Sequence, residues 1–297
     1  MKKVIVRIKG GLGNQLFCYA AARRLALVNN AELVIDDVTG FVRDRKFQRQ
    51  YALDRFSISA RKATAAERLE PFERYHRGFK KYLSRGRPFE ERRYLEQAGT
   101  DFDERLLSLK VRGILYLDGL WQSENYFKDV EEVIRQDLCF KDLPMDDQNQ
   151  HISEQIFSKN SVALHVRWFD GLGNKSGRNV PYDYYKRAIT LIESKLESPY
   201  YFLFSDNLKL ACDTLDLPID RTISVCHNKG DKNSWADLWL MSQCQHFIIA
   251  NSTFSWWGAW LSREKEKVII CPEFKMMKGG RATWNFEGQI PGNWLTI

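Results

Sequence analysis

The second half of the chain alternates short apolar segments with amphipathic ones, and this alternation constrains the fold more than any other feature. The apolar segments are SVALHV (161–166), YYFLFS (200–205), TISVC (222–226), HFIIAN (246–251) and KVIIC (267–271). Segments with helical periodicity separate them, at 181–196, 208–215, 234–244 and 253–262. Strands that alternate with helices in this way predict a mostly parallel, doubly wound sheet with both faces covered.

The first half begins with the same pattern. It reads as a strand at 3–9, the turn GGLGNQ, a helix at 16–28 and a strand at 32–36, with a further strand and helix at 114–120 and 123–138. The stretch KDLPMDDQNQ (141–150) has the polar and proline content of a linker. We therefore predict two domains, residues 1–150 and 151–297.

Composition excludes several classes of protein. No run approaches the roughly 18 apolar residues that a membrane span needs, and Arg7 and Lys9 interrupt the first apolar segment, which therefore lacks the core of a signal peptide. We expect a cytoplasmic protein. The six cysteines form no CxxC pair and no zinc-ligand spacing, so we expect reduced thiols and no metal site.

Residues 41–93 form a basic segment, with 16 Lys and Arg against 7 Asp and Glu, in a chain whose formal net charge is +7. The charges are spread and accompany no nucleic-acid-binding motif, so we expect no nucleic acid. A merely solvated basic face, an anionic substrate and anionic lipid all remain alternatives. One hypothesis is that the N-terminal domain rests on the inner face of an anionic membrane.

Polar side chains follow the predicted strands where each strand ends. They are His165, Arg167 and Asp170 after the first strand of the second half, Ser205 and Asp206 after the second, and Asn251, Ser252 and Thr253 after the fourth. Ligands of doubly wound sheets bind at the carboxyl ends of the strands. One edge of the sheet is therefore the predicted site.

Two strand-to-helix turns could hold a phosphate. In GGLGNQ, Gly13 lies where helix-terminal amides are exposed. Leu16 replaces the third glycine of the dinucleotide-binding fingerprint, which argues against a dinucleotide site. Asp36, at the end of the next strand, could bind a ribose and keeps dinucleotide binding open as an alternative. In NSTFSWW, Ser252 either caps the helix or joins Thr253 in an anion site. The tryptophans that follow, Trp256, Trp257 and Trp260, are expected in the core.

Three further side chains fit a nucleoside diphosphate. Arg167 could pair with a phosphate held over a helix N-terminus at the same edge. His165, one step deeper, either hydrogen-bonds a base or sugar or is an ordinary core histidine. Asp237 lies among apolar residues in SWADLWLMSQ, and its carboxylate needs donors, which a guanine edge, a neighbouring arginine or a helix end would supply.

Several runs together resemble the bacterial α-1,2-fucosyltransferases of glycosyltransferase family 11. They are GGLGNQLF, YALDRFSI, YLDGLWQSENYF, HVRWFD, YYFLFSDN, DLWLMSQCQHFIIANSTFSWWGAWLS and GNWLTI, which extend almost end to end. The resemblance implies a GT-B-like α/β fold, with two Rossmann-like domains facing across a cleft. It also implies inverting, metal-independent transfer of L-fucose from GDP-fucose to O2 of a galactose in a glycan acceptor, in the synthesis of a surface polysaccharide such as O-antigen, with no cofactor.

The resemblance also implies roles for individual residues. Arg167 would hold the donor β-phosphate, and His165 and Asp237 would contact guanine. Ser252, Thr253 and Phe254 would line the diphosphate and fucose, and Asn14, with Gly13 in the same loop, would reach the donor from the N-terminal domain.

Inversion requires the acceptor hydroxyl to lose a proton, and a carboxylate facing the cleft is the simplest base. Asp170 is the first candidate, and Asp206, which also lies on the donor side, is the second. The sequence departs from the family pattern HxRRxD at Trp168, in place of the second arginine, and at Cys18, where the family usually has Gln. These departures motivate the alternative of an inactive nucleotide-sugar- or carbohydrate-binding protein; an NAD-dependent oxidoreductase is disfavoured by Leu16.

Overall fold

The computed structural model describes residues 1–144, 146–169, 177–273, 275, 277–278 and 281–297. The chain divides into two compact units, residues 1–141 with 287–289 and residues 142–286 with 290–297. The division falls inside the predicted linker, but before the predicted boundary at 150. The reason is that α5 (Asp147–Ser158) packs within the second unit, where Ser153 Oγ donates to Gln243 Oε1 at 2.7 Å.

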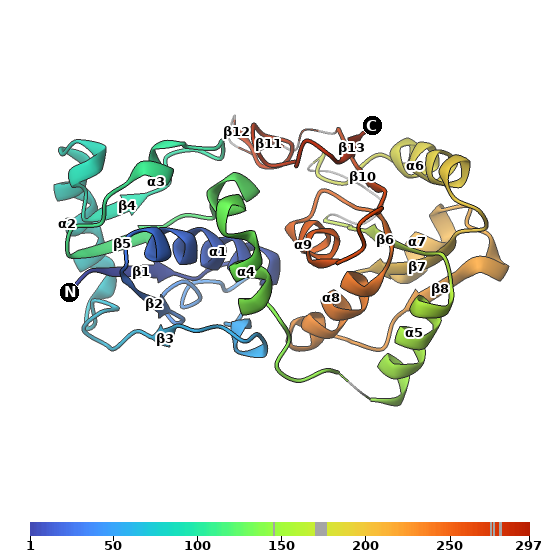
Figure 1. The fold of residues 1–297 in the computed structure, drawn as a ribbon, viewed down its shortest axis with the longest axis horizontal. Helices are drawn as coiled ribbons and strands as arrows, with labels where there is room; N and C mark the ends of the chain where they lie inside the picture. The colour runs from blue at the N-terminus through green and yellow to red at the C-terminus, as the bar shows by residue number, and fades with distance from the viewer. Residues whose placement is uncertain (145, 170–176, 274, 276, 279–280) are drawn as a thin grey trace. The chain divides into compact units, whose positions relative to one another are not determined.

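The first unit contains a five-stranded parallel sheet in the order β3-β2-β1-β5-β4 (Figure 1). The strands are β1 (Lys3–Arg7), β2 (Glu32–Asp36), β3 (Arg61–Lys62), β4 (Tyr94–Glu96) and β5 (Ile114–Asp118). The helices are α1 (Leu12–Val28), α2 (Glu73–Arg85), α3 (Arg105–Ser108) and α4 (Glu131–Asp137), with 3-10 turns at Leu53–Arg55, Phe89–Glu91, Glu124–Tyr126 and Lys128–Val130. The predicted β-α-β opening at 3–36 is confirmed.

The second unit contains a six-stranded parallel sheet in the order β13-β10-β9-β6-β7-β8 (Figure 1). The strands are β6 (Ser161–Val166), β7 (Tyr200–Ser205), β8 (Thr222–Val225), β9 (His246–Ile248), β10 (Ile269–Cys271) and β13 (Leu295–Thr296). The helices after α5 are α6 (Tyr182–Lys195), α7 (Leu208–Thr214), α8 (Ser234–Gln243) and α9 (Thr253–Leu261), with 3-10 turns at Ile219–Arg221 and Asp231–Asn233. A separate antiparallel pair joins β11 (Met277–Lys278) and β12 (Arg281–Ala282).

Side-chain alternation along β6 assigns its residues to two faces of the second sheet. Val162, Leu164 and Val166 pack into one apolar cluster with Tyr184 and Ala188 of α6. The alternate residues face the other way, and the ring of His165 on that face lies 5.9 Å from the ring of Phe254 in α9. Both faces are covered, which explains why every residue of β6 is buried.

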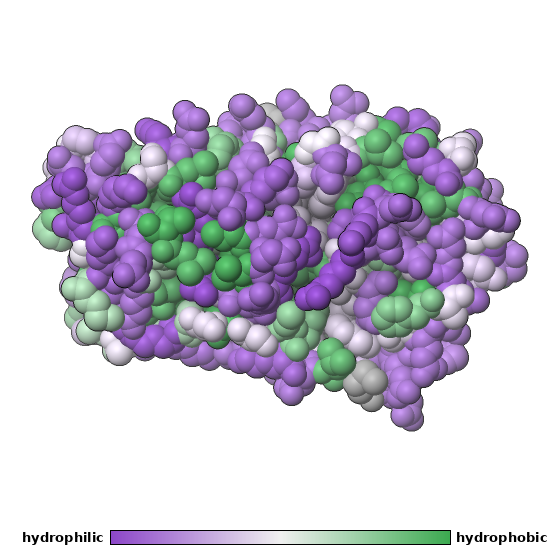
Figure 2. Space-filling model, in the orientation of Figure 1, coloured by the Kyte–Doolittle hydropathy of each residue, from purple (hydrophilic) through white to green (hydrophobic). Residues whose placement is uncertain are grey.

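The helices α8 and α9 pack against each other (Figure 1). Trp256 and Trp257 of α9 are fully buried and Trp260 is 5% exposed, so the prediction that these rings belong to the core is confirmed. Gly258 permits the close approach of the two helices, because a Cβ there would lie only 2.3 Å from Met241 Sδ of α8. Hydrophilic side chains cover much of the face in view, with hydrophobic groups between them (Figure 2). Among the residues described, no helix is both long and apolar enough to span a membrane.

Candidate functional site

The carboxyl ends of β6, β7 and β9 meet at one edge of the second sheet. The parallel register pairs His165 with Phe204 of β7, and Leu164 with Ile248 of β9. Residues that follow these positions are therefore brought together, as the sequence predicts. The candidate site is built from these strand ends and from the first turn of α9.

Arg167 is held by Asp206, which comes directly after β7. The Oδ2 atom of Asp206 lies 3.0 Å from Nη1 of Arg167, and its Oδ1 atom accepts the Trp168 N–H at 2.9 Å. The side chain of Arg167 is 32% exposed, so the guanidinium is fixed in direction and still open to a ligand. Both oxygens of Asp206 are engaged, which makes it a positioning group for the segment that follows β6.

Arg178 brings a second guanidinium to the same place. The Phe169 ring lies within cation–π distance of both, with its centroid 5.4 Å from Cζ of Arg167 and 5.3 Å from Cζ of Arg178. The backbone carbonyl of Arg178 accepts from Nδ2 of Asn251 at 2.8 Å, which ties this segment to the end of β9. Sequence reasoning missed Arg178, because it follows no strand.

Trp168, which replaces that arginine, faces the opposite side. It packs against the apolar cluster between β6 and α6, in line with Val166 two residues earlier. Its Nε1 atom is buried and has no hydrogen-bond partner among the described residues. The substitution therefore packs a partly buried indole against the core beside the site.

His165 is a buried imidazole, 6% exposed, with no described hydrogen-bond partner for its Nδ1 atom. Burial, and then the nearby charge of Arg167, lower the pKa of His165 to about 3, so the ring is neutral at physiological pH. A buried polar atom without a partner is costly and is usually satisfied by a ligand or water. This favours the ligand-binding interpretation of His165 over the ordinary core interpretation.

The first turn of α9 is capped by Ser252, whose Oγ accepts the Phe254 N–H at 3.3 Å. The capping interpretation of Ser252 is thus confirmed. Thr253 is the first residue of the helix, and Phe254 places its ring beside His165. The cap leaves other first-turn amides of α9 without intrahelical acceptors, as at any helix N-terminus, and these favour an anion.

Asp237 lies in the first turn of α8 at the end of a polar network. Its Oδ1 atom accepts from Nδ2 of Asn228 at 2.9 Å, and burial raises the pKa of Asp237 to about 6. Asn228 also donates to Oδ1 of Asn149 at 2.9 Å, which the His227 ring contacts at 2.8 Å. The donor to Asp237 is therefore an amide, not an arginine.

Asn228 and His227 were missed by the sequence analysis. The signal was present, because both residues follow β8, just as Asp206 follows β7. Asn149 could not be found this way, since it lies in α5 and reaches the network only through packing.

In the first unit, GGLGNQ joins β1 to α1 with its own internal contacts. Gly10 has φ +80°, and a Cβ there would clash with the Asn14 side chain. Gly13 lies in the first turn of α1. Asn14 accepts from Nε2 of Gln122, after β5, at 2.7 Å, so Asn14 lies at the carboxyl edge of the first sheet.

Two other predicted residues have clear outcomes in the structure. Cys18 is buried and its Sγ donates to the carbonyl of Gly119 at 3.1 Å, so this departure from the family pattern is a packing residue. Asp36 accepts from the Thr39 N–H at 2.9 Å and from the Thr39 hydroxyl, which occupies the carboxylate that a dinucleotide ribose would need. Asp170 lies outside the described residues.

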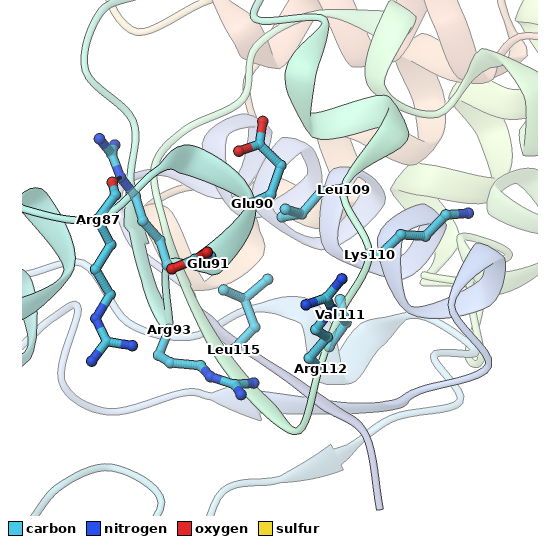
Figure 3. A pocket seen from close by; sticks show the side chains of 10 residues that line it. Arg87, Glu90, Glu91, Arg93, Leu109, Lys110, Val111, Arg112 and Leu115 are labelled. Carbon is cyan, nitrogen blue, oxygen red and sulfur yellow. Dashed lines mark hydrogen bonds between the residues drawn. The ribbon is translucent and has the colours of Figure 1, made fainter.

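A separate hollow of about 210 Å³ lies in the first unit (Figure 3). Its lining includes Arg87, Arg93, Lys110 and Arg112, with Glu90 and Glu91 among them. Arg93 directly precedes β4 and Arg112 lies two residues before β5, so this hollow lies at the amino ends of these strands of the first sheet. Within the described ranges, no group of three or more His, Cys, Asp or Glu side chains could hold a metal ion.

Comparison with known proteins gives concordant results. Residues 3–282 match glycosyl transferase family 11. The chain is 26% identical over 280 residues to an Escherichia coli alpha-1,2-colitosyltransferase, covering 92% of each chain. It is 30% identical over 290 residues to the Escherichia coli O-antigen biosynthesis glycosyltransferase WbnK, covering 89% of this chain and 92% of the relative.

A solved structure shows the same fold. The NodZ alpha-1,6-fucosyltransferase soaked with GDP-fucose superposes with a TM-score of 0.52 at 15% identity, over 88% of this chain and 92% of that one. The predicted GT-B-like α/β class, with two parallel sheets, is thereby confirmed. On the family match over nearly its whole length, the chain belongs to glycosyl transferase family 11 and is a glycosyltransferase.

Proposed function

We propose that this glycosyltransferase moves L-fucose from GDP-fucose to O2 of a galactose in a glycan acceptor, with inversion and without a metal ion. The reaction would take place in the cytoplasm, as a step in the synthesis of a surface polysaccharide. The relatives named for α-1,2 transfer and for O-antigen biosynthesis support the reaction class and the pathway. The observation that carries the proposal is the buried His165, whose Nδ1 has no described partner, beside the exposed guanidinium of Arg167.

The guanine would bind between His165 and Asp237. Neutral His165 offers one donor and one acceptor nitrogen, and Asp237 is a half-buried acceptor that only the Asn228 amide supports among the described contacts. The N1–H and exocyclic amine of guanine are adjacent donors that match one carboxylate. Their binding would stabilise the charged form of Asp237, which burial alone disfavours.

The diphosphate would bind at Arg167 and at the first turn of α9. Arg167 is held by Asp206 and needs little reorganisation to meet a phosphate. Ser252, Thr253 and Phe254 begin α9, whose N-terminal amides favour negative charge. Departure of the nucleoside diphosphate develops charge on the β-phosphate, and fixed cationic and amide donors lower the barrier to that step.

The acceptor hydroxyl would lose its proton to a carboxylate. Asp206 is a poor base because both of its oxygens are engaged by Arg167 and Trp168. We therefore keep Asp170 as the proposed base. Asn14 and Gly13 are proposed to contact the donor from the first unit, on the family resemblance alone.

A colitose donor is the second candidate, because one relative is named an alpha-1,2-colitosyltransferase. Colitose is L-fucose without the 3-hydroxyl. A site that hydrogen-bonds this hydroxyl would strongly reject the deoxy sugar, whereas an apolar site would discriminate weakly.

The test is a transfer assay with GDP-fucose and GDP-colitose, a panel of β-galactosides, and linkage analysis of each product by NMR. We expect α-1,2-fucosylated galactose, at a rate that EDTA does not change. A preference for GDP-colitose would support the second candidate. GDP binding without transfer or hydrolysis would support the inactive binding protein, and a requirement for added Mg²⁺ or Mn²⁺ would contradict the metal-independent mechanism.

A further inference from the structure

Helix α2 of the first unit exposes its aromatic face to solvent. Phe72, at its N-cap, and Tyr75, Phe79, Tyr82 and Leu83 along it are between 48% and 75% exposed. The first four are spaced by three, four and three residues, and Leu83 follows Phe79 by four, which places all five in one stripe along the helix. In α2 itself, Ser84 is the buried residue. The apolar side of an ordinary surface helix faces the core, so the apolar side of α2 points in the opposite direction, toward solvent.

The opposite, charged face of α2 attaches the helix to the sheet. Lys81 Nζ lies 2.5 Å from Oε1 of Glu96 and 3.6 Å from Oδ2 of Asp118, at the carboxyl ends of β4 and β5. The Tyr94 N–H donates to Ser84 Oγ at 3.0 Å. These contacts fix the rotation of α2, since turning the aromatic stripe inward would break the Lys81–Glu96 ion pair and remove one of the cations near Asp118, a buried carboxylate that Lys9 and Tyr94 also contact, each at 2.7 Å.

A contiguous exposed aromatic stripe of this kind usually marks an interaction surface. Phenylalanine, leucine and tyrosine along one side of a helix, with basic residues beside them, are typical of helices that lie in a membrane interface. Tyrosine fits that position because its ring is apolar and its hydroxyl remains hydrated. Isolated exposed apolar residues, by contrast, need no explanation.

Basic residues lie on and next to α2. Arg74 is exposed, Arg85 is paired with Glu96, and the chain continues from α2 directly into the basic hollow of Figure 3, which begins at Arg87. Within the part of the chain that the structure describes, Arg87, Arg93, Lys110 and Arg112 form no ion pair. Glu90 and Glu91 line the same hollow but are outnumbered by its cations, and a cluster with a net positive charge is complementary to lipid phosphates.

We propose that α2 is a membrane-docking helix, which inserts the stripe Phe72–Leu83 into the interface of an anionic bilayer while the adjacent arginines contact lipid phosphates. A second copy of the chain fits this surface less well. A symmetric contact through α2 would bring two sets of like-charged arginines together, which is unfavourable. The docking is independent of the donor and acceptor proposed above.

The test is flotation of the full chain with vesicles of phosphatidylcholine, alone or mixed with phosphatidylglycerol. We expect flotation with the anionic vesicles at low salt and its loss at 1 M salt, where the Debye length falls to about 3 Å. The variant F72S/F79S should lower the partition coefficient by about tenfold or more. R87Q/R93Q should lower it roughly fivefold for each charge.

A matched control removes two exposed apolar residues from the second unit, F157S/I219S, where Phe157 is 70% and Ile219 is 94% exposed. It should float like the wild type. All three variants should keep the circular dichroism spectrum and the transfer rate on a soluble acceptor, because none touches the candidate site. If the wild type does not float, or if F72S/F79S floats as well as F157S/I219S, the proposal is overturned. A wild-type dimer that F72S/F79S converts to monomer, with no flotation, would assign the stripe to self-association instead.

Discussion

Asp237→Asn should stabilise the free protein and weaken its binding of GDP. Burial raises the pKa of Asp237 from 3.8 to about 6, so at neutral pH the folded chain contains a carboxylate in an environment that favours its neutral form. Asparagine has nearly the same shape, can still accept the hydrogen bond from Asn228, and carries no charge. The substitution removes a penalty in the free protein and a charged acceptor in the complex.

The magnitude follows from the difference between the folded and unfolded pKa values. A shift of about 2 units corresponds to roughly 3 kcal/mol at pH 8, and this is an upper value because Asp237 is only half-buried. The change of stability with pH has the opposite sign to that expected for a salt-bridged aspartate, whose folded-state pKa is lowered. The folded state binds the extra proton, so the penalty is absent below pH 4, grows between pH 4 and 6, and is complete above pH 6.

The assay compares thermal unfolding of the variant and the wild type at pH 5 and pH 8, without and with GDP. Without GDP, the stability gained by Asp237→Asn should be about twice as large at pH 8 as at pH 5, and a gain of 1 kcal/mol would raise Tm by roughly 2–4 °C. With GDP, calorimetry should show a Kd about 10- to 100-fold higher for the variant, because a charge-assisted acceptor is lost. Wild-type affinity should fall as the pH drops below 6.

The control is Asp213→Asn, at an exposed aspartate of α7, which should change neither property. If Asp237→Asn is less stable than the wild type at pH 8, burial does not penalise this carboxylate. Unchanged GDP affinity in the variant would refute the assignment of Asp237 to the guanine site, whatever its effect on stability.

Other variants test the remaining groups. Arg167→Ala should lower kcat/KM in the transfer assay by roughly 10²- to 10³-fold, as expected for loss of a fixed donor to the leaving group; a rate like that of Arg187→Ala, an exposed control on α6, would contradict this. Arg178→Ala should cost about 10-fold or more if its guanidinium also meets the diphosphate, and no loss would assign it to packing on Phe169. Asp206→Asn should lower kcat/KM by no more than about fivefold, since a half-exposed ion pair contributes little. A far larger loss of kcat/KM, with a changed pH profile, would identify Asp206 as the base. Asp137→Ala should lower the free energy of unfolding by about 3 kcal/mol, because it leaves Arg23 and the buried Tyr19 without their acceptor. The measurement is a urea titration, and an unchanged urea concentration at the midpoint of unfolding would refute the prediction.

Much of the candidate site follows from the sequence because parallel strands place their carboxyl ends at one edge. Asp206 could be placed beside His165 and Arg167 by that rule alone, although it is far from them in the chain. The same rule would have found Asn228 after β8. It could not find Arg178 or Asn149, whose positions depend on how a loop and a helix pack.

The sequence by itself determined the alternation of strands and helices, the edge that carries the site and, through its motifs, the family. These features depend on local periodicity and on the order of residues, both of which can be read from the sequence without knowing how the chain packs. Only the tertiary structure decided which way side chains face. It packed Trp168 against the core, engaged both oxygens of Asp206, and left the aromatic face of α2 outside, because the ion pairs of Lys81 hold the opposite face of that helix to the sheet.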